Sequence, residues 1–213
     1  MRLTKHGHSC VRLEHGGGTL VVDPGTLSEQ TALQGANAVL VTHEHFDHFD
    51  KDGLLAAAHA EPELRIWTNA AVAAQLEPIK DRVHVVAHGD VLDIGGLPVH
   101  VYGEKHAPTH LDPVGNVGFH IGGVLFHPGD AFTVPEEPVQ TLLVPAGGPW
   151  LKSIEILDYV AAVAPQQAYS IHEGLFNEMG LQIVDAILGA ASAKSMGGRE
   201  ARRIPVGDSV ELR

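Results

Sequence analysis

The chain has 213 residues, of which 44% are hydrophobic and 19% charged, so it can bury a sizeable core, and one domain over residues 1–213 is the simplest organisation. Its formal charge of −12 at pH 7 repels phosphate backbones and anionic lipids, which argues against nucleic-acid or membrane binding. A single cysteine, a polar N-terminus and the lack of any apolar run of about 18 residues predict a cytoplasmic protein.

In chain order, short β-branched runs bounded by Gly, Asp and Pro alternate with stretches of helical periodicity. The runs predict strands at residues 11–13, 19–22, 38–41, 83–86, 99–102, 117–120, 124–126, 142–144, 168–171 and 209–212. The periodicity predicts helices over residues 52–59, 69–75, 153–163 and 181–193. Because helices follow only some strands, the pattern favours an α/β fold with mixed sheets flanked by helices over a strictly alternating βαβ series.

The most informative segment follows the predicted strand at residues 38–41. Four candidate metal ligands occupy six positions there, namely His43, His45, Asp47 and His48. Imidazole and carboxylate suit zinc and related divalent ions, and a loop lets neighbouring side chains converge as a regular strand does not. A surface loop with chance histidines is the alternative. It would leave a costly group of polar side chains at the end of a buried strand.

Similar residues follow other predicted strands. His106 comes after residues 99–102, Asp130 after 124–126 and His172 after 168–171. Because ligands of open α/β sheets bind beyond the carboxyl ends of strands, we expect these side chains to meet the first group.

Asp23 also ends a predicted strand, at residues 19–22. It could accept a hydrogen bond from the ligand loop or from a ligating imidazole. A turn-forming role in Asp-Pro-Gly is an almost equal alternative.

This pattern resembles the metallo-β-lactamase-fold superfamily over most of the chain. The HxHxDH signature of that superfamily is present in His43, His45, Asp47 and His48, and its later histidine, aspartate and final histidine have counterparts in His106, Asp130 and His172. The segments at residues 6–9, 23–24 and 125–130 look most like the small UlaG-like branch of metal-dependent hydrolases. The resemblance implies a four-layer αββα sandwich with a dinuclear site in the groove between two sheets.

The resemblance also implies how the ligands are shared. It places His43, His45 and His106 on one divalent ion, Asp47, His48 and His172 on a second, and Asp130 between them. Two such ions hold a bridging water as hydroxide near neutral pH, and Asp47 could also orient that water or receive its proton. An all-nitrogen and oxygen ligand set suits zinc, while manganese or iron are compatible.

Four further residues are candidates for the pocket or for supporting roles. His110 is an alternative to His106 as the third imidazole, although Pro108 argues against a helix that would pair the two. The resemblance makes His8 a pocket candidate, with a structural histidine as the commoner explanation. His127 could support Asp130. Trp150 could form part of the groove wall, with core packing as the default.

The function predicted from these features is metal-dependent hydrolysis of a small ester-like bond, in a lactone, a thioester or a phosphodiester. Two alternatives remain. One is an iron-dependent oxidoreductase on the same fold, although the diiron oxidases of the superfamily usually carry an acidic residue where this chain has His45. The other is a non-catalytic metal-binding protein. The partner expected is a small-molecule substrate, and assembly into a homo-oligomer is left open.

Overall fold

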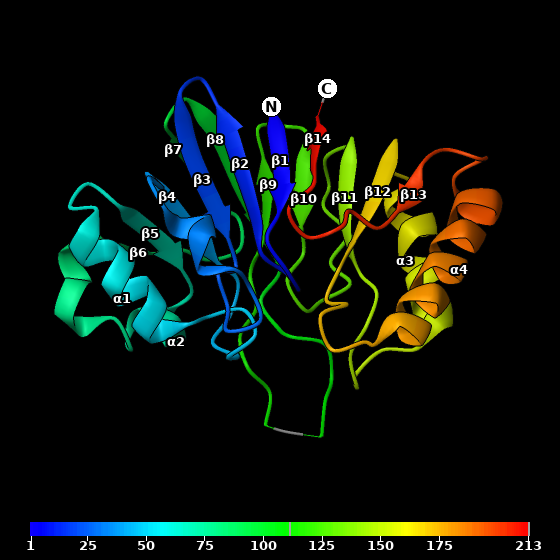
Figure 1. Cartoon of the computed structure of the whole chain (residues 1–213), viewed down its shortest axis with the longest axis horizontal. Coiled ribbons are helices and arrows are strands. Elements are labelled where there is room, and N and C mark those ends of the chain that lie inside the picture. Colours follow the sequence, from blue (N-terminus) through cyan, green and yellow to red (C-terminus); the bar gives the residue numbers. More distant parts are fainter. Residues whose placement is uncertain (111, 213) are drawn as a thin grey trace.

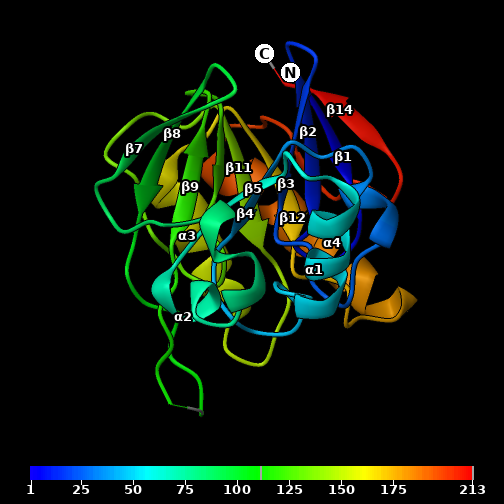
Figure 2. The ribbon, with the colours of Figure 1, turned by 90° about the vertical axis from the view of Figure 1, so that its left-hand side faces the viewer.

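The structure is a computed structural model that describes residues 1–110 and 112–212. Within them two seven-stranded sheets pack face to face, and helices cover the outer face of each sheet (Figure 1; Figure 2). This arrangement confirms the α/β fold class and the αββα sandwich expected from the resemblance.

The first sheet has the strand order β14-β1-β2-β3-β4-β5-β6. Its strands are β1 (Arg2–Lys5), β2 (Val11–His15), β3 (Gly18–Val22), β4 (Ala38–Val41), β5 (Arg65–Thr68), β6 (Val83–Val85) and β14 (Ser209–Glu211). Helices α1 (Lys51–Ala60) and α2 (Ala70–Ala73) lie on its outer side, with 3₁₀ turns at Gln30–Leu33 and Glu77–Arg82. Strands β3 to β6 run parallel, so their carboxyl ends share one edge.

The second sheet has the order β13-β12-β11-β10-β9-β8-β7. Its strands are β7 (Val91–Ile94), β8 (Leu97–Tyr102), β9 (Gly118–Ile121), β10 (Leu125–His127), β11 (Thr141–Pro145), β12 (Gln167–Ile171) and β13 (Ala201–Arg202). Helices α3 (Ser153–Val163) and α4 (Glu178–Ser195) cover its outer face. Strand β8 pairs antiparallel with β9, and β9 with β10, so β8 points the same way as β10 to β12.

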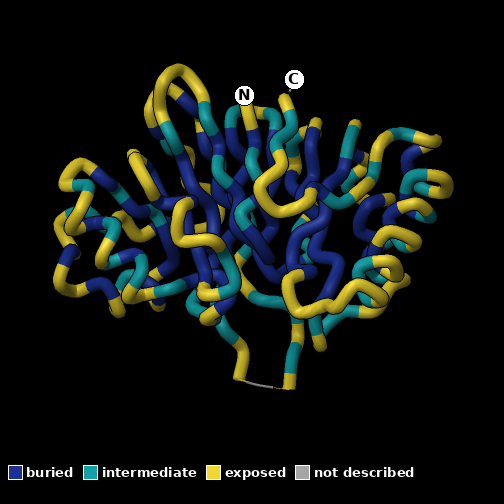
Figure 3. Tube along the Cα trace, viewed as in Figure 1, coloured by how far each residue is buried: buried dark blue, intermediate teal, exposed yellow. Residues whose placement is uncertain are grey.

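Three apolar clusters hold these layers together. The largest lies between the sheets and joins residues such as Leu40 of β4 to Phe119 of β9. A second cluster joins Val39 of β4 to Leu54 of α1, and a third joins Leu142 of β11 to Val160 of α3. All four residues of β4 are buried, and successive strand residues face opposite sides, so β4 is buried on both faces. Figure 3 shows the buried strands running through the middle of the molecule.

The structure adds elements that the sequence did not predict. Strands β1, β5, β7 and β13 were missed, and α2 is shorter than the helix expected over residues 69–75. The sequence of β1 is largely polar and ends in Lys5. The side chain of this lysine is buried and forms an ion pair with Glu173. Helix α4 begins earlier than expected because the Asn177 side chain accepts a hydrogen bond from the Gly180 amide.

Over residues 1–110 and 112–212, no helix is both long and apolar enough to cross a bilayer.

Candidate metal centre

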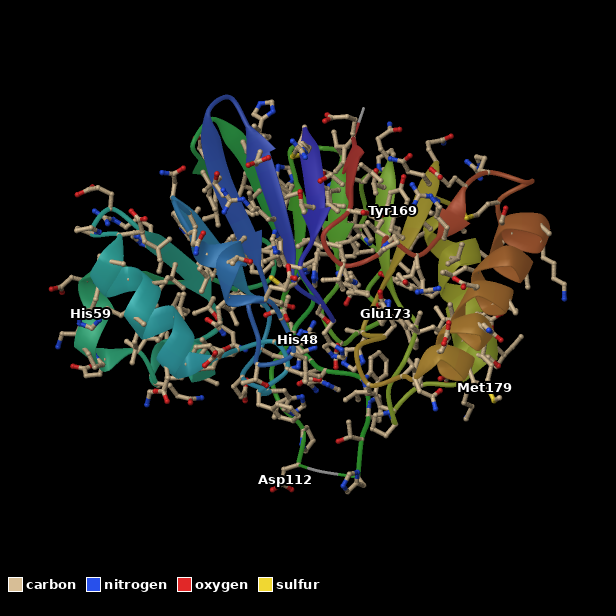
Figure 4. The ribbon with its side chains drawn as sticks, viewed as in Figure 1. His48, His59, Asp112, Tyr169, Glu173 and Met179 are labelled. Atoms are coloured by element: carbon tan, nitrogen blue, oxygen red, sulfur yellow. The ribbon has the colours of Figure 1, made fainter. Side chains whose placement is uncertain are left out.

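The candidate ligands meet at the edge where the parallel strands of both sheets end. Strand β4 leads into the loop with His43 to His48, β10 leads to Asp130, and β12 leads directly to His172. Figure 4 shows His48 low in the middle of the molecule, between the two halves of the sandwich. The structure therefore brings the seven candidate ligands from four separate segments to one place.

The side chains form two groups whose potential ligand atoms lie within 4.8 Å of one another. The first group consists of His43, His45, His106 and Asp130, and the second of His8, Asp47, His48 and His172. In the first group, His43 Nε2 lies 3.1 Å from His45 Nδ1, and His106 Nε2 lies 3.2 Å from Asp130 Oδ2. Each group has the size and the nitrogen and oxygen chemistry of a divalent-metal site.

Asp130 connects the two groups. Its Oδ1 lies 3.0 Å from His48 Nε2, and its Oδ2 lies 2.9 Å from His172 Nε2 and 3.2 Å from His106 Nε2. The indole of Trp150 donates to Oδ2 over 3.1 Å. Among the described residues, Asp130 Oδ1, His48 Nε2 and His172 Nε2 are buried atoms without a hydrogen-bond partner. A metal ion could bind the free lone pairs of these three converging atoms. The residues therefore fit the metal ions that the fold implies.

Neighbouring groups fix which nitrogen of each imidazole keeps its lone pair. Thr42 Oγ1 gives its hydrogen to Asp23 Oδ2, so it can only accept from His43 Nδ1, 2.9 Å away. His48 Nδ1 faces Asp23 Oδ2 at 2.7 Å, and His172 Nδ1 faces the Gly147 carbonyl oxygen at 2.6 Å. In each ring Nδ1 therefore carries the hydrogen and Nε2 is left to bind a metal, the usual arrangement of ligating histidines.

His8 differs from the other imidazoles in its group. The amide of Gly174 donates to His8 Nδ1 over 3.1 Å, so the hydrogen of the neutral ring is on Nε2. That Nε2 lies 3.1 Å from Asp47 Oδ2. Burial lowers the pKa of His8 to about 4, against the opposing effect of this hydrogen bond, so the ring is neutral at pH 7. His8 is thus placed to donate to Asp47 and not to ligate a metal.

This difference predicts distinct outcomes for two substitutions. We expect His8→Phe to keep the wild-type number of bound metal ions while lowering kcat/KM about 10- to 100-fold, because Asp47 loses a donor that orients it. We expect His48→Ala to lose an ion. Elemental analysis of the purified variants, beside their turnover, measures both effects. An ion missing from His8→Phe would show instead that His8 is a ligand.

The charges of the second group are strongly coupled. Burial opposes ionisation of Asp47, but the nearby His172 imidazole and the hydrogen bond with His8 hold its pKa well below the usual range. Burial also disfavours a charged His172, yet the carboxylates of Asp130 and Asp47, 2.9 and 3.5 Å from its Nε2, outweigh this and raise its pKa to about 9. A proton on His172 thus faces two carboxylates near neutral pH. A cation bound there would replace that proton, so metal binding should release it.

The other sequence candidates are placed as follows. His110 is exposed and lies outside both groups, so the structure brings His106 and not His110 to the cluster. His127 donates from Nε2 to the Ser9 carbonyl and accepts from the Gly129 amide at Nδ1, which steadies the turn before Asp130. The ring of Trp150 packs beside those of His106 and His172.

Asp23 is fully buried, and its carboxylate accepts three hydrogen bonds from described residues. They come from the amide of Thr42 at 2.8 Å, the hydroxyl of Thr42 at 2.8 Å and Nδ1 of His48 at 2.7 Å. Its φ of 49° lies in the left-handed region, as do those of His8 and His172, at 36° and 71°. Such conformations are strained for residues with a Cβ and persist where the surroundings hold them, often at functional sites.

Several supporting residues were missed by sequence reasoning. Asn116 accepts from the Asp130 amide over 3.0 Å and donates to the Pro128 carbonyl, yet an isolated asparagine gives no signal in the sequence. A Cβ on Gly25 would lie 2.0 Å from the Asp47 carbonyl oxygen, and one on Gly148 3.0 Å from the His172 ring. Of these two glycines, only Gly25 could have been identified from the sequence, because it belongs to the Asp-Pro-Gly turn.

A cavity of about 550 Å³ opens beside the cluster. Among the side chains that line it are the candidate ligands His45, Asp47, His106, Asp130 and His172. The volume falls within the roughly 300–1,000 Å³ of small-molecule sites. The cluster is therefore reachable by a small molecule from the cavity.

Comparison with known proteins agrees with this picture. A model of the β-lactamase superfamily domain matches residues 2–172. Protein Rv0786c of Mycobacterium tuberculosis is 38% identical over 183 residues, which cover 82% of this chain and 85% of that protein. A UPF0173 metal-dependent hydrolase of Caldivirga maquilingensis is 25% identical over 189 residues, covering 81% of this chain and 82% of the relative.

Among solved structures, Igni18, a metallo hydrolase from Ignicoccus hospitalis, superimposes with a TM-score of 0.73. The match covers 98% of this chain and 97% of Igni18 at 18% identity, so it supports the fold alone. The match of the family model over residues 2–172 and the 38% identity to the Mycobacterium protein are the stronger findings. The chain therefore belongs to the β-lactamase superfamily, in the UlaG-like branch that its segments at residues 6–9, 23–24 and 125–130 resemble.

Proposed function

We propose that this chain is a metal-dependent hydrolase that holds two divalent ions, with zinc as the first candidate, and cleaves an ester-like bond in a small molecule. A lactone, a thioester or a phosphodiester is the bond class considered. The observation that carries the proposal is the pair of His and Asp groups, joined through Asp130, at the wall of a cavity. The UPF0173 metal-dependent hydrolases similar to this chain support the same general activity.

The residues that would hold the ions divide between the two halves of the sandwich. His43, His45 and His106 would bind one ion, Asp47, His48 and His172 the other, and Asp130 would contact both. Ions held there lower the pKa of water and polarise the bond under attack. The Nδ1 contacts of the imidazoles keep their Nε2 atoms aimed at the cluster before any ion binds, and this preorganisation favours a defined geometry.

Asp47 is the residue that we propose takes part in proton transfer. Its Oδ2 receives the His8 Nε2–H at 3.1 Å and lies 3.5 Å from His172 Nε2, while its side chain also lines the cavity. A carboxylate in this position can orient an attacking water and accept its proton. The neutral His8 behind it can hold the carboxylate in place without adding a competing positive charge.

The test is metal analysis combined with turnover of lactone, thioester and phosphodiester substrates, before and after His45→Ala. We expect the wild type to bind metal stoichiometrically and to hydrolyse at least one of the three bond types. The variant should bind less metal and lose at least about 100-fold in kcat/KM, because one ion loses a ligand. A wild-type protein that binds no stoichiometric metal would contradict the proposal. An iron-loaded protein that consumes oxygen would favour an oxidoreductase instead.

A further inference from the structure

We propose that the cavity beside the ligand cluster binds the uncharged, apolar part of the substrate, so that this chain prefers neutral esters and lactones with an alkyl or aryl group. Substrates with a second anionic group, away from the reacting bond, are disfavoured. The inference deepens the proposed hydrolase function and rests on it. Its basis is the chemistry of the cavity wall that lies away from the candidate ligands.

Two exposed apolar side chains stand on that wall. Phe46 is 63% exposed and Leu175 is 54% exposed, and both line the cavity. Phe46 lies between two candidate ligands in the loop after β4, whereas Leu175 lies in the turn after His172 and β12. The two halves of the sandwich thus each present a large apolar side chain next to a metal-binding turn.

Most of the remaining wall is apolar as well, and its polar members are Thr109 and His110. Pro108, Pro149 and the indole of Trp150 line the same cavity. Trp150 is held in place by its hydrogen bond to Asp130 and by packing against Phe132, so it offers a rigid face. Exposed apolar side chains that gather around a concave site mark a place for an apolar ligand, whereas scattered ones need no explanation.

The described lining of the cavity also has no permanently cationic side chain. Among the described residues that line it there is no lysine or arginine. Lys105 lines a different pocket with Glu104 and Glu136, and Lys152 Nζ lies 4.0 Å from Glu155 Oε1. A phosphate or carboxylate bound in this cavity would therefore meet no lysine or arginine among its described lining residues, in a chain of net charge −12.

The turnover experiment compares matched 4-nitrophenyl esters, which share one leaving group. The neutral series is the acetate, butyrate and hexanoate, and the anionic partner is the mono-ester of adipic acid, which resembles the hexanoate but ends in a carboxylate. We expect kcat/KM to rise about fourfold per methylene until the cavity is filled. We expect the hexanoate to exceed the adipate mono-ester at least tenfold. Equal or reversed preference would overturn the inference.

Substitutions in the cavity wall test whether its residues cause the preference for the neutral ester. Leu175→Lys should improve the adipate mono-ester relative to the hexanoate at least fivefold, because it adds the missing cation. Val206→Ser, a change at an exposed apolar residue that is outside the cavity lining, should leave the ratio unchanged. An unchanged ratio in Leu175→Lys would contradict the assignment of this wall.

A binding measurement separates the inference from the hydrolase function. The neutral dye N-phenyl-1-naphthylamine should bind the metal-loaded protein, and Phe46→Ser and Leu175→Ser should each weaken its binding at least threefold, while Val206→Ser should not. If the dye does not bind, or binds both variants like the wild type, the apolar site is refuted even if esters are cleaved. If the dye binds as expected and no ester is hydrolysed, the hydrolase proposal fails while the apolar site stands.

Discussion

Replacement of Asp130 by asparagine is expected to remove at least one bound metal ion and to lower kcat/KM on the order of 10³-fold, which corresponds to about 4 kcal/mol. Asp130 is the carboxylate nearest to both groups. Its oxygens lie 2.9 to 3.2 Å from Nε2 of His48, His106 and His172, and 4.0 Å from His43. The amide keeps the size of the side chain but removes the negative charge and turns one acceptor into a donor, which faces nitrogen lone pairs.

The measurement is the metal content per chain together with kcat/KM on the best substrate of the wild type. Thermal unfolding of the variant without added metal shows whether it is folded. Asp81→Asn, the same change at an exposed position away from the cluster, is the matched control and should leave metal content and turnover unchanged. If Asp130→Asn kept both ions, Asp130 would not be the residue that the two sites share.

That the candidate ligands come together could be predicted from the sequence because most of them directly follow a strand. His43 to His48 follow β4, Asp130 follows β10 and His172 follows β12, so hydrophobic patterning alone brings them to a common sheet edge. His106 is less local. Its position depends on the loop after β8, whose Ala107 amide donates to the Asp130 carbonyl, a contact that no local pattern encodes.

The supporting contact of Asp23 with a candidate ligand imidazole was expected from its place at a strand end, but other supporting contacts could not be predicted because they join residues far apart in the chain. Gly174 donates to His8 across the interface between the sheets, and this one amide decides which nitrogen of the imidazole carries hydrogen. Likewise, the burial of Lys5 in a strand could not be predicted, because its ion-pair partner Glu173 is remote in sequence. Trp150 was expected on the groove wall and lines the cavity, but Phe46 and Leu175 were missed, since they come to line the same cavity only after the sheets pack.

Asp23→Asn is expected to weaken metal binding by about 10- to 100-fold and to destabilise the fold by about 2 kcal/mol or more. The carboxylate accepts from His48 Nδ1 and from both the amide and the hydroxyl of Thr42, and it is fully buried. An asparagine amide offers one acceptor oxygen in place of two, so at least one buried donor loses its partner. Asparagine tolerates the left-handed φ of 49°, so backbone strain adds little to the effect.

The reason for the loss of affinity is the tautomer of His48. With an amide NH₂ facing Nδ1, the ring is best satisfied by accepting there, which moves its hydrogen to Nε2, the atom that faces Asp130. A metal must then displace that hydrogen before it can bind. Metal titration and denaturant unfolding measure the two effects, with Asp93→Asn as a control because its carboxylate accepts only an exposed bond from Gly96. Excess zinc should restore turnover in Asp23→Asn, whereas an unchanged affinity would show that Asp23 serves the turn and not His48.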